Sequence, residues 1–133
     1  MKAEIIAVGT ELLLGQIVDT NSRWIAEQLA ELGVDLYYKT TVGDNEERLT
    51  KVLEQSFERA DLVITTGGLG PTQDDITREV VADTLEQELI KDEEALAEIE
   101  SYFAEMGREM TDNNKKQAFL PRNAQMISNN NGT

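Results

Sequence analysis

Short apolar runs alternate along the chain with stretches whose apolar residues recur at helical spacing. Runs that are apolar, β-branched or aromatic predict strands, and apolar residues three and four positions apart predict helices packed on a core. By this pattern we predict strands at 4–8, 34–42 and 61–66, and helices at 22–32, 46–60 and 75–85.

Capping residues support these helix boundaries. Asn21 is a suitable N-cap for the helix at 22–32, and either Asp44 or Asn45 would cap the next helix. Trp24 shares its helical spacing with Leu29, so we expect Trp24 to lie in the core.

The remainder of the chain predicts helices at 92–107 and 113–120, then a last strand at 124–128. The run at 61–66 has no polar alternation, which is typical of a central parallel strand covered on both faces. Strands that alternate with helices imply right-handed crossovers. We therefore predict one α/β domain over 1–133, a three-layer α/β/α arrangement with a mostly parallel sheet.

The length, composition and net charge of the chain exclude several classes of function. The chain has 133 residues, 40% of them hydrophobic and 29% charged, as in an ordinary globular domain. A net charge of −14 argues against nucleic acid and anionic membranes as partners. Much of the acid lies at 83–109, where we expect solvated helix faces. No apolar run reaches the roughly 20 residues of a membrane helix, and we expect a cytoplasmic protein.

Two absences limit the chemistry. The chain contains no Cys and no His, so it has no thiolate nucleophile and lacks the commonest general base and metal ligand. None of its serines lies in a G-x-S-x-G turn. An enzyme of this composition would depend on carboxylates, backbone amides, hydroxyls and a bound metal.

The loops after the first three predicted strands combine glycine with acidic residues. They are "GTE" at 9–11, "GD" at 43–44 and "GGLGPTQDD" at 67–75. Ligands of open α/β sheets bind beyond the carboxyl ends of the strands, where these three loops would meet. The loops are therefore the candidate site.

The third loop has the most specific pattern. Gly67 and Gly68 would let a ligand approach the backbone closely, and the following helix would favour an anion. The loop is neither a P-loop nor a G-x-G-x-x-G motif. In the alternative interpretation the glycines only form a turn and Asp74 or Asp75 only caps the helix. Likewise, Thr10 and Glu11 could be loop residues without a role.

Acidic side chains beside a phosphate site require an explanation. Glu11, Asp44, Asp74 and Asp75 would repel phosphate unless a divalent cation lay between them. Mg²⁺ takes oxygen ligands, usually one or two carboxylates together with substrate phosphates. Such a cation would polarise a phosphoryl oxygen and activate water, which makes metal-dependent phosphate chemistry a hypothesis for this site.

Three segments of the chain are distinctive in combination: "AVGTELLLGQIVDTNSRWIAEQLAELG", "TVGDN" and "LVITTGGLGPTQDDIT". Together they resemble the N-terminal domain of the competence/damage-inducible protein A (CinA) family, which is similar to MoaB/Mog-type molybdopterin-binding domains. The resemblance implies a three-layer fold, a homodimer, and hydrolysis of ADP-ribose to AMP and ribose 5-phosphate with Mg²⁺, Mn²⁺ or Co²⁺. By this resemblance, phosphate is bound by Gly67, Gly68, Leu69 and Gly70. Catalytic or metal-binding roles fall to Asp44 and Asp75, with Asp74 beside them. Thr10 and Glu11 line the same cleft.

Two departures keep other functions open. The molybdopterin branch usually has Gly-Gly-Thr-Gly in the third loop, and Leu69 replaces that threonine, which favours the CinA branch. The family pattern continues beyond "NNNGT", so we expect a domain that is incomplete at its C-terminal end, without the family's deamidase domain. The alternatives are a pterin-phosphate binding module of molybdenum cofactor biosynthesis and a non-catalytic assembly domain.

Overall fold

A parallel sheet of three strands forms the centre of the computed structural model, which describes residues 1–133. The strands are β1 (Lys2–Val8), β2 (Asp35–Val42) and β3 (Leu62–Thr66), in the order β2-β1-β3. The middle strand β1 is buried from Ala3 to Val8 because it has a neighbour on each edge. These elements confirm the three predicted parallel strands.

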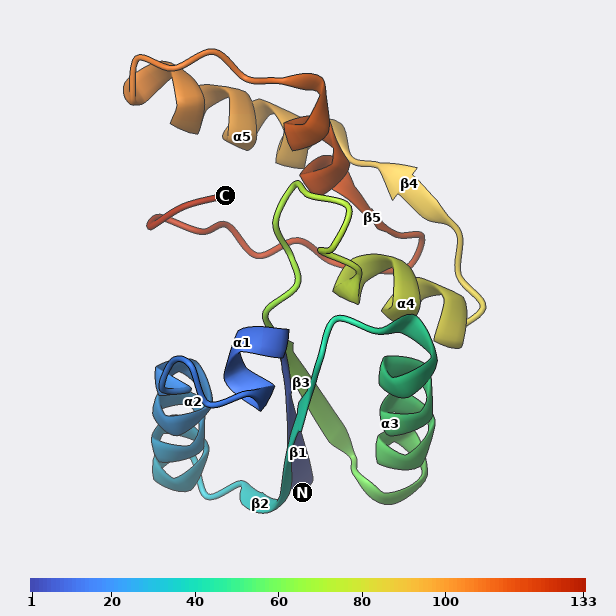
Figure 1. Cartoon of the computed structure of the whole chain (residues 1–133). Helices are drawn as coiled ribbons and strands as arrows, with labels where there is room; N and C mark the ends of the chain where they lie inside the picture. Colours follow the sequence, from blue (N-terminus) through green and yellow to red (C-terminus); the bar gives the residue numbers. More distant parts are fainter.

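Helices cover both faces of the sheet, as Figure 1 shows. They are α2 (Thr20–Glu31) on one face and α3 (Glu46–Arg59) with α4 (Thr77–Thr84) on the other. Successive side chains of a strand point to opposite faces, so β1 supplies both cores. Ala3 and Ile5 pack with Leu29 of α2. The opposite core consists of Ile6, Val8, Val42, Leu49, Leu53 and Val80. The predicted three-layer arrangement is confirmed.

A second group of elements lies beyond the carboxyl ends of the parallel strands (Figure 1). It comprises β4 (Leu89–Lys91), α5 (Glu93–Glu105), the 3₁₀-helix η1 (Asp112–Ala118) and β5 (Phe119–Pro121). The strands β4 and β5 pair antiparallel, and Ala95, Ile99 and Ala118 form a small core beneath α5. This group places α5 and η1 over the loops of the candidate site.

The first helix differs from its prediction in its cap and in its buried face. Helix α2 begins at Thr20, and its cap is Asp19, whose Oδ1 accepts a hydrogen bond from Ser22 N (3.0 Å), in place of Asn21. Trp24 is 62% exposed, so its predicted core position is wrong. The helix turns Ile25 and Leu29 toward the sheet, and Trp24 lies about 100° away around the axis.

The third strand and the helix after it also differ. Strand β3 packs on both faces but lies at the edge of the sheet, so each of its residues is only half buried. Helix α4 begins at Thr77 and not at Asp75. Residues 72–75 form a turn in which Asp75 N donates to Thr72 O (3.3 Å), so the chain is not yet helical there.

The C-terminal predictions were the least accurate. The predicted strand at 124–128 is absent, because Ala124 N donates to Pro121 O in a turn and the chain then runs without regular structure. The predicted helix at 113–120 is a 3₁₀-helix that ends at Ala118, since Phe119 must already be extended to pair with Lys91 of β4. Short 3₁₀ segments are common in such connections.

Candidate functional site

The loops that leave the three parallel strands lie against one another. Thr10 N, after β1, donates to Asp44 Oδ2 after β2 (3.0 Å), and Asp44 N donates in return to Thr10 Oγ1 (3.1 Å). The loop after β3 meets β1 at Gly67, whose backbone lies against the carbonyl oxygen of Val8. The fold therefore brings the three candidate loops to one edge of the sheet.

The turn after β3 leaves no room for side chains at two positions. Gly67 and Gly68 have φ of +88° and +63°, the left-handed region that favours glycine. A Cβ at Gly67 would lie 2.1 Å from Val8 O, and one at Gly68 would lie 2.3 Å from Thr77 Oγ1. Thr77 Oγ1 in turn donates to Gly67 O (2.7 Å), which ties the turn to the start of α4.

Three consecutive N–H groups in this turn have no acceptor in the protein. The backbone N–H groups of Gly67, Gly68 and Leu69 donate none of the hydrogen bonds of the chain. Strand β3 ends one residue earlier, at Thr66, so these donors lie outside the sheet ladder. Gly67 and Gly68 are half buried and Leu69 is exposed, so these donors are accessible to a ligand.

Asp75 holds the rest of the loop in place. Its Oδ2 accepts hydrogen bonds from Thr72 N (2.9 Å) and Thr72 Oγ1 (2.7 Å) and lies against Gly70. Lys116 Nζ of η1 donates to Thr72 O (2.8 Å) and to the carbonyl oxygen of Asp75. Burial raises the pKa of Asp75, but hydrogen bonds from Thr72 and Gly70 and the charge of Lys116 outweigh it and lower the pKa. Asp75 is thus a carboxylate at neutral pH.

The other acidic candidates differ in how they are held. Asp74 is exposed and takes part in no hydrogen bond or ion pair of the chain. Glu11 lies in α1 (Thr10–Leu13), and its carboxylate lies over Gly9, where a Cβ would be 2.7 Å from Oε1. The Glu11 carboxylate therefore folds back over the loop that follows β1.

The residues can hold a metal ion only together with a ligand. No group of three or more acidic side chains is gathered in a way that would hold a cation by itself. Asp44 and Asp75 each use Oδ2 to brace a loop and leave Oδ1 without a hydrogen bond. Mg²⁺ needs only one or two carboxylates when phosphates and water complete its shell, so the free Oδ1 of either side chain has the chemistry of a ligand for such an ion.

Polar residues that the sequence did not indicate as site residues also border the loops. Asn21 Nδ2 donates to Thr66 Oγ1 (3.4 Å), and Gln117 Nε2 donates to Leu69 O (3.4 Å). Arg78, next to Thr77 in α4, is buried. These residues lie in segments predicted as a cap or as helices, where a polar residue gives no sign of a ligand.

This geometry agrees with the families that the chain is similar to. Residues 4–129 match the family described as "Probable molybdopterin binding domain". A crystal structure of the protein CinA from Thermoplasma acidophilum superimposes with a TM-score of 0.88 and 35% identity, over 98% of this chain and 76% of that one. The chain belongs to the molybdopterin-binding domain family, in its CinA branch.

Whole-chain similarity extends to curated CinA-type relatives. Competence-damage inducible proteins of Bacillus cereus strain B4264 and Bacillus mycoides strain KBAB4 are 56% and 55% identical to it over 132 residues. These matches cover 99% of this chain but 32% of each relative, so the chain spans about a third of their length.

More distant members share the fold over part of the chain. The tungsten cofactor synthesizing protein MoaB from Pyrococcus furiosus has a TM-score of 0.62 and 26% identity, over 80% of this chain and 64% of that one. The molybdopterin biosynthesis enzyme MoaB from Thermus thermophilus has a TM-score of 0.59 and 28% identity, over 62% of this chain and 53% of that one.

None of the helices of this CinA-type domain is long and apolar enough to cross a bilayer.

Proposed function

We propose that this domain binds the phosphate groups of a small heterocyclic ligand at the loop after β3. The observation that carries the proposal is the run of free N–H groups at Gly67, Gly68 and Leu69. Successive backbone N–H groups without acceptors form anion-binding concavities. Two of the three residues have no Cβ, so phosphate oxygens would reach the backbone without obstruction.

A pterin phosphate is the first candidate ligand. The family description names molybdopterin, and the solved relatives from Pyrococcus furiosus and Thermus thermophilus are described as proteins of tungsten cofactor or molybdopterin synthesis. Binding alone requires only the free amides and the shape of the cleft. It does not require a preformed cluster of acidic metal ligands, which this chain lacks.

Hydrolysis of ADP-ribose to AMP and ribose 5-phosphate is the second candidate. Leu69 stands where the molybdopterin branch usually has threonine, and similarity over the whole chain is to CinA and competence-damage inducible proteins. In this reaction one water is consumed and one P–O bond of the diphosphate breaks. Thr10 and Glu11 would line the cleft, with phosphate oxygens on Gly67, Gly68, Leu69 and Gly70.

The acidic residues would serve this second function by holding a divalent cation. Asp44 and Asp75 would place their free Oδ1 atoms on Mg²⁺, Mn²⁺ or Co²⁺, with exposed Asp74 beside them. When bound, such a cation polarises a phosphoryl oxygen and lowers the pKa of a water ligand. Glu11 and Asp44 would otherwise repel the phosphates that the amides attract.

Calorimetric titration with molybdopterin and with ADP-ribose, alongside an assay for AMP release, tests both candidates. We expect ADP-ribose binding to need Mg²⁺, and AMP release to fall by about two orders of magnitude or more in Asp44→Asn and Asp75→Asn. Asp112→Asn is the matched control, because Asp112 is an exposed carboxylate paired only with Lys115.

Each outcome assigns a function. Binding of molybdopterin without AMP release identifies a pterin-binding module. Metal-dependent AMP release that is lost in the two variants but kept in Asp112→Asn identifies the pyrophosphatase. If neither compound binds, the phosphate site itself is rejected, and an assembly role for the domain becomes the better hypothesis.

A further inference from the structure

Arg78 is a buried cation without a hydrogen bond. It is the second residue of α4, only 9% exposed, and its Nε and Nη2 are fully buried and have no acceptor in the chain. The nearest carboxylate oxygen, Glu79 Oε1, is 3.9 Å from Nη2, too far for a hydrogen bond. Glu79 Oε1 is closer to Lys116 Nζ, at 3.4 Å. Burial lowers the pKa of Arg78 despite these neighbours, in keeping with a charge that lacks a partner.

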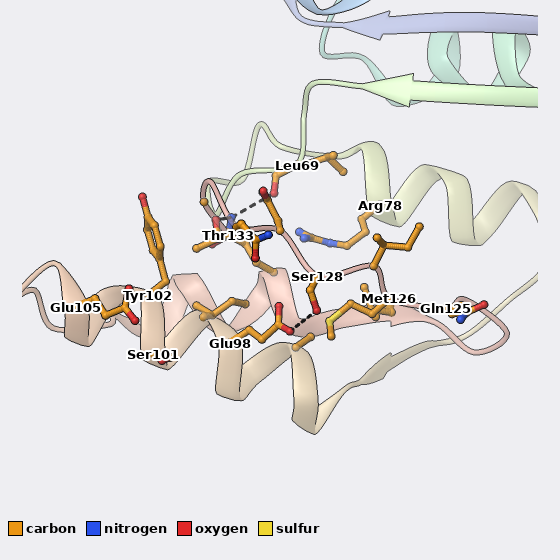
Figure 2. A pocket seen from close by; sticks show the side chains of 18 residues that line it. Leu69, Arg78, Glu98, Ser101, Tyr102, Glu105, Gln125, Met126, Ser128 and Thr133 are labelled. Atoms are coloured by element: carbon orange, nitrogen blue, oxygen red, sulfur yellow. Dashed lines mark hydrogen bonds between the residues drawn. The ribbon is translucent and has the colours of Figure 1, made fainter. Parts of the chain in front are cut away.

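The Arg78 side chain points into a cavity beside α5. This cavity has a volume of about 620 Å³ and lies between α5, the C-terminal segment 125–133 and Leu69 of the glycine loop. Figure 2 shows the guanidinium running from α4 into this space, toward Thr133 and Ser128. The volume falls within the range of small-molecule sites, about 300–1,000 Å³. Ile99, Tyr102 and Met126 give the cavity an apolar wall.

The start of α4 adds donors beside Arg78. Ile76 precedes the helix and no side chain caps it. Thr77 could supply a cap, but its hydroxyl is used on Gly67 O. Thr77 N donates to Gly68 O (3.1 Å). The next N–H groups of an uncapped helix generally attract anions, and they lie in the same turn as the unpaired guanidinium.

The cavity has no anion of its own for Arg78. Glu98 and Glu105 line the same cavity, yet neither contacts the guanidinium, and Glu98 Oε1 accepts a hydrogen bond from Ser128 Oγ (2.7 Å). An unpaired buried charge is costly, and a planar guanidinium matches phosphate oxygens with two parallel hydrogen bonds. Glu79 is the acidic side chain beside Arg78, and its Oε2 is likewise buried without a partner. At 3.9 Å from Nη2, Glu79 Oε1 forms no hydrogen bond with the guanidinium, whose donors are therefore free for an oxyanion from outside the chain.

We infer that Arg78 binds a phosphate group of a phosphorylated small molecule whose ring system occupies the cavity beside α5. The cavity adjoins the glycine loop at Leu69, whose carbonyl accepts from Gln117. A ligand that carries two phosphate groups would thus place one on the loop amides and the other on Arg78. This inference rests on the proposed phosphate site, and it adds a second phosphate contact and a place for the ring.

Calorimetry with inorganic pyrophosphate and with ADP-ribose, both of which carry two phosphate groups, tests it on the wild type, Arg78→Gln and Arg78→Lys. Because a charged hydrogen bond is lost, we expect Arg78→Gln to bind these ligands about 10- to 100-fold more weakly. The loss should be smaller in Arg78→Lys, which keeps the charge but cannot donate two parallel hydrogen bonds. Arg122→Gln, on a surface arginine paired with Glu88, is the control and should bind as the wild type does.

A thermal melt separates this role from a structural one. Without ligand, Arg78→Gln should melt at the same temperature as the wild type or higher, because it removes an unpaired buried charge. Pyrophosphate should raise the melting temperature of the wild type and have little effect on Arg78→Gln. Equal affinities in the wild type and Arg78→Gln would overturn the inference.

The outcome is distinguishable from failure of the proposed function. Ligand binding that is lost in Gly67→Ala but unchanged in Arg78→Gln leaves the loop site standing and rejects the role of Arg78. Pyrophosphate binding that depends on Arg78, without AMP release from ADP-ribose, supports the inference and rejects the hydrolase. An Arg78→Gln variant that melts well below the wild type shows a structural role and also rejects the inference.

Discussion

Gly67 has a φ of +88° and lies against the carbonyl oxygen of Val8, so a methyl group there has no space. We predict that Gly67→Ala destabilises the domain by about 2–4 kcal/mol, from the left-handed backbone and from overlap with β1. It should also displace the free N–H groups and weaken phosphate binding. Urea unfolding measures the first effect and calorimetry the second.

Gly33 is the matched control for this substitution. It has a φ of +71°, but a Cβ there would meet nothing within 4 Å. Gly33→Ala should therefore cost only about 1–2 kcal/mol, the backbone effect alone, and leave ligand binding intact. Equal losses of stability in the two variants would show that the contact with Val8 yields easily and that the loop is not a rigid frame.

Glu4 is the residue through which acid should weaken the fold. Its carboxylate is fully buried in β1 and accepts hydrogen bonds from Arg59 Nη2 (2.7 Å) and Nε (2.9 Å), while Arg59 lies over the ring of Tyr38. Burial raises the pKa of Glu4, but hydrogen bonds from Arg59, Ser56 and Thr40 outweigh it and lower the pKa.

A carboxyl whose pKa is lowered by folding stabilises the protein above its ordinary pKa. We therefore predict that the free energy of unfolding falls as the pH drops from the ordinary carboxyl pKa, about 4.3, through the lowered pKa of Glu4. In urea unfolding across this range, the free energy of unfolding should depend less steeply on pH in Glu4→Gln than in the wild type. Glu47→Gln, which alters an exposed pair with Lys51, should follow the wild type. If the free energy of unfolding changes with pH in the same way in all three proteins, Glu4 is not the cause of the loss of stability in acid.

At the level of secondary structure, the elements of the central sheet could be predicted because their signal is local. The apolar runs of β1 and β3 and the spacing of Leu49 and Leu53 in α3 lie on faces that the sheet buries. Asn45 and Asp92 cap α3 and α5, where their short polar side chains are expected. Tertiary contacts only reinforce what these segments prefer.

The secondary-structure predictions were wrong where contacts between distant segments determine the structure. The strands β4 and β5 have three residues each, too short for a period, and they pair across about 30 positions of sequence. Helical spacing allowed Trp24 to face inward, but the buried stripe of α2 centres on Leu29. Neither the pairing nor the position of the stripe is visible in the residues themselves.

The candidate site was predictable in position but not in detail. Glycines after apolar strands predicted where Thr10, Asp44 and Gly67 would meet, since parallel strands end at one edge. The bracing role of Asp75 depends on Thr72, and the isolation of Arg78 depends on α5 and the C-terminal segment. Such features arise from packing between distant segments.

For the whole molecule, charge is the dominant feature. The net charge is −14, and most ion pairs are exposed, such as Arg23 with Glu27 and Lys51 with Glu47. Exposed pairs contribute little, so they offset only a small part of the mutual repulsion. Self-repulsion of this kind destabilises a compact state and is screened by salt.

We predict that raising NaCl from about 20 mM to about 500 mM stabilises the domain by about 1 kcal/mol, or about 3–5 °C in melting temperature. MgCl₂ at the same ionic strength separates screening from binding. If Asp44 and Asp75 hold a cation together with phosphate, Mg²⁺ in the presence of pyrophosphate should raise the melting temperature further in the wild type than in Asp44→Asn or Asp75→Asn. An equal rise in NaCl and MgCl₂ with pyrophosphate present means that Mg²⁺ acts only as a screening ion. A melting temperature that falls in NaCl would contradict the charge argument itself.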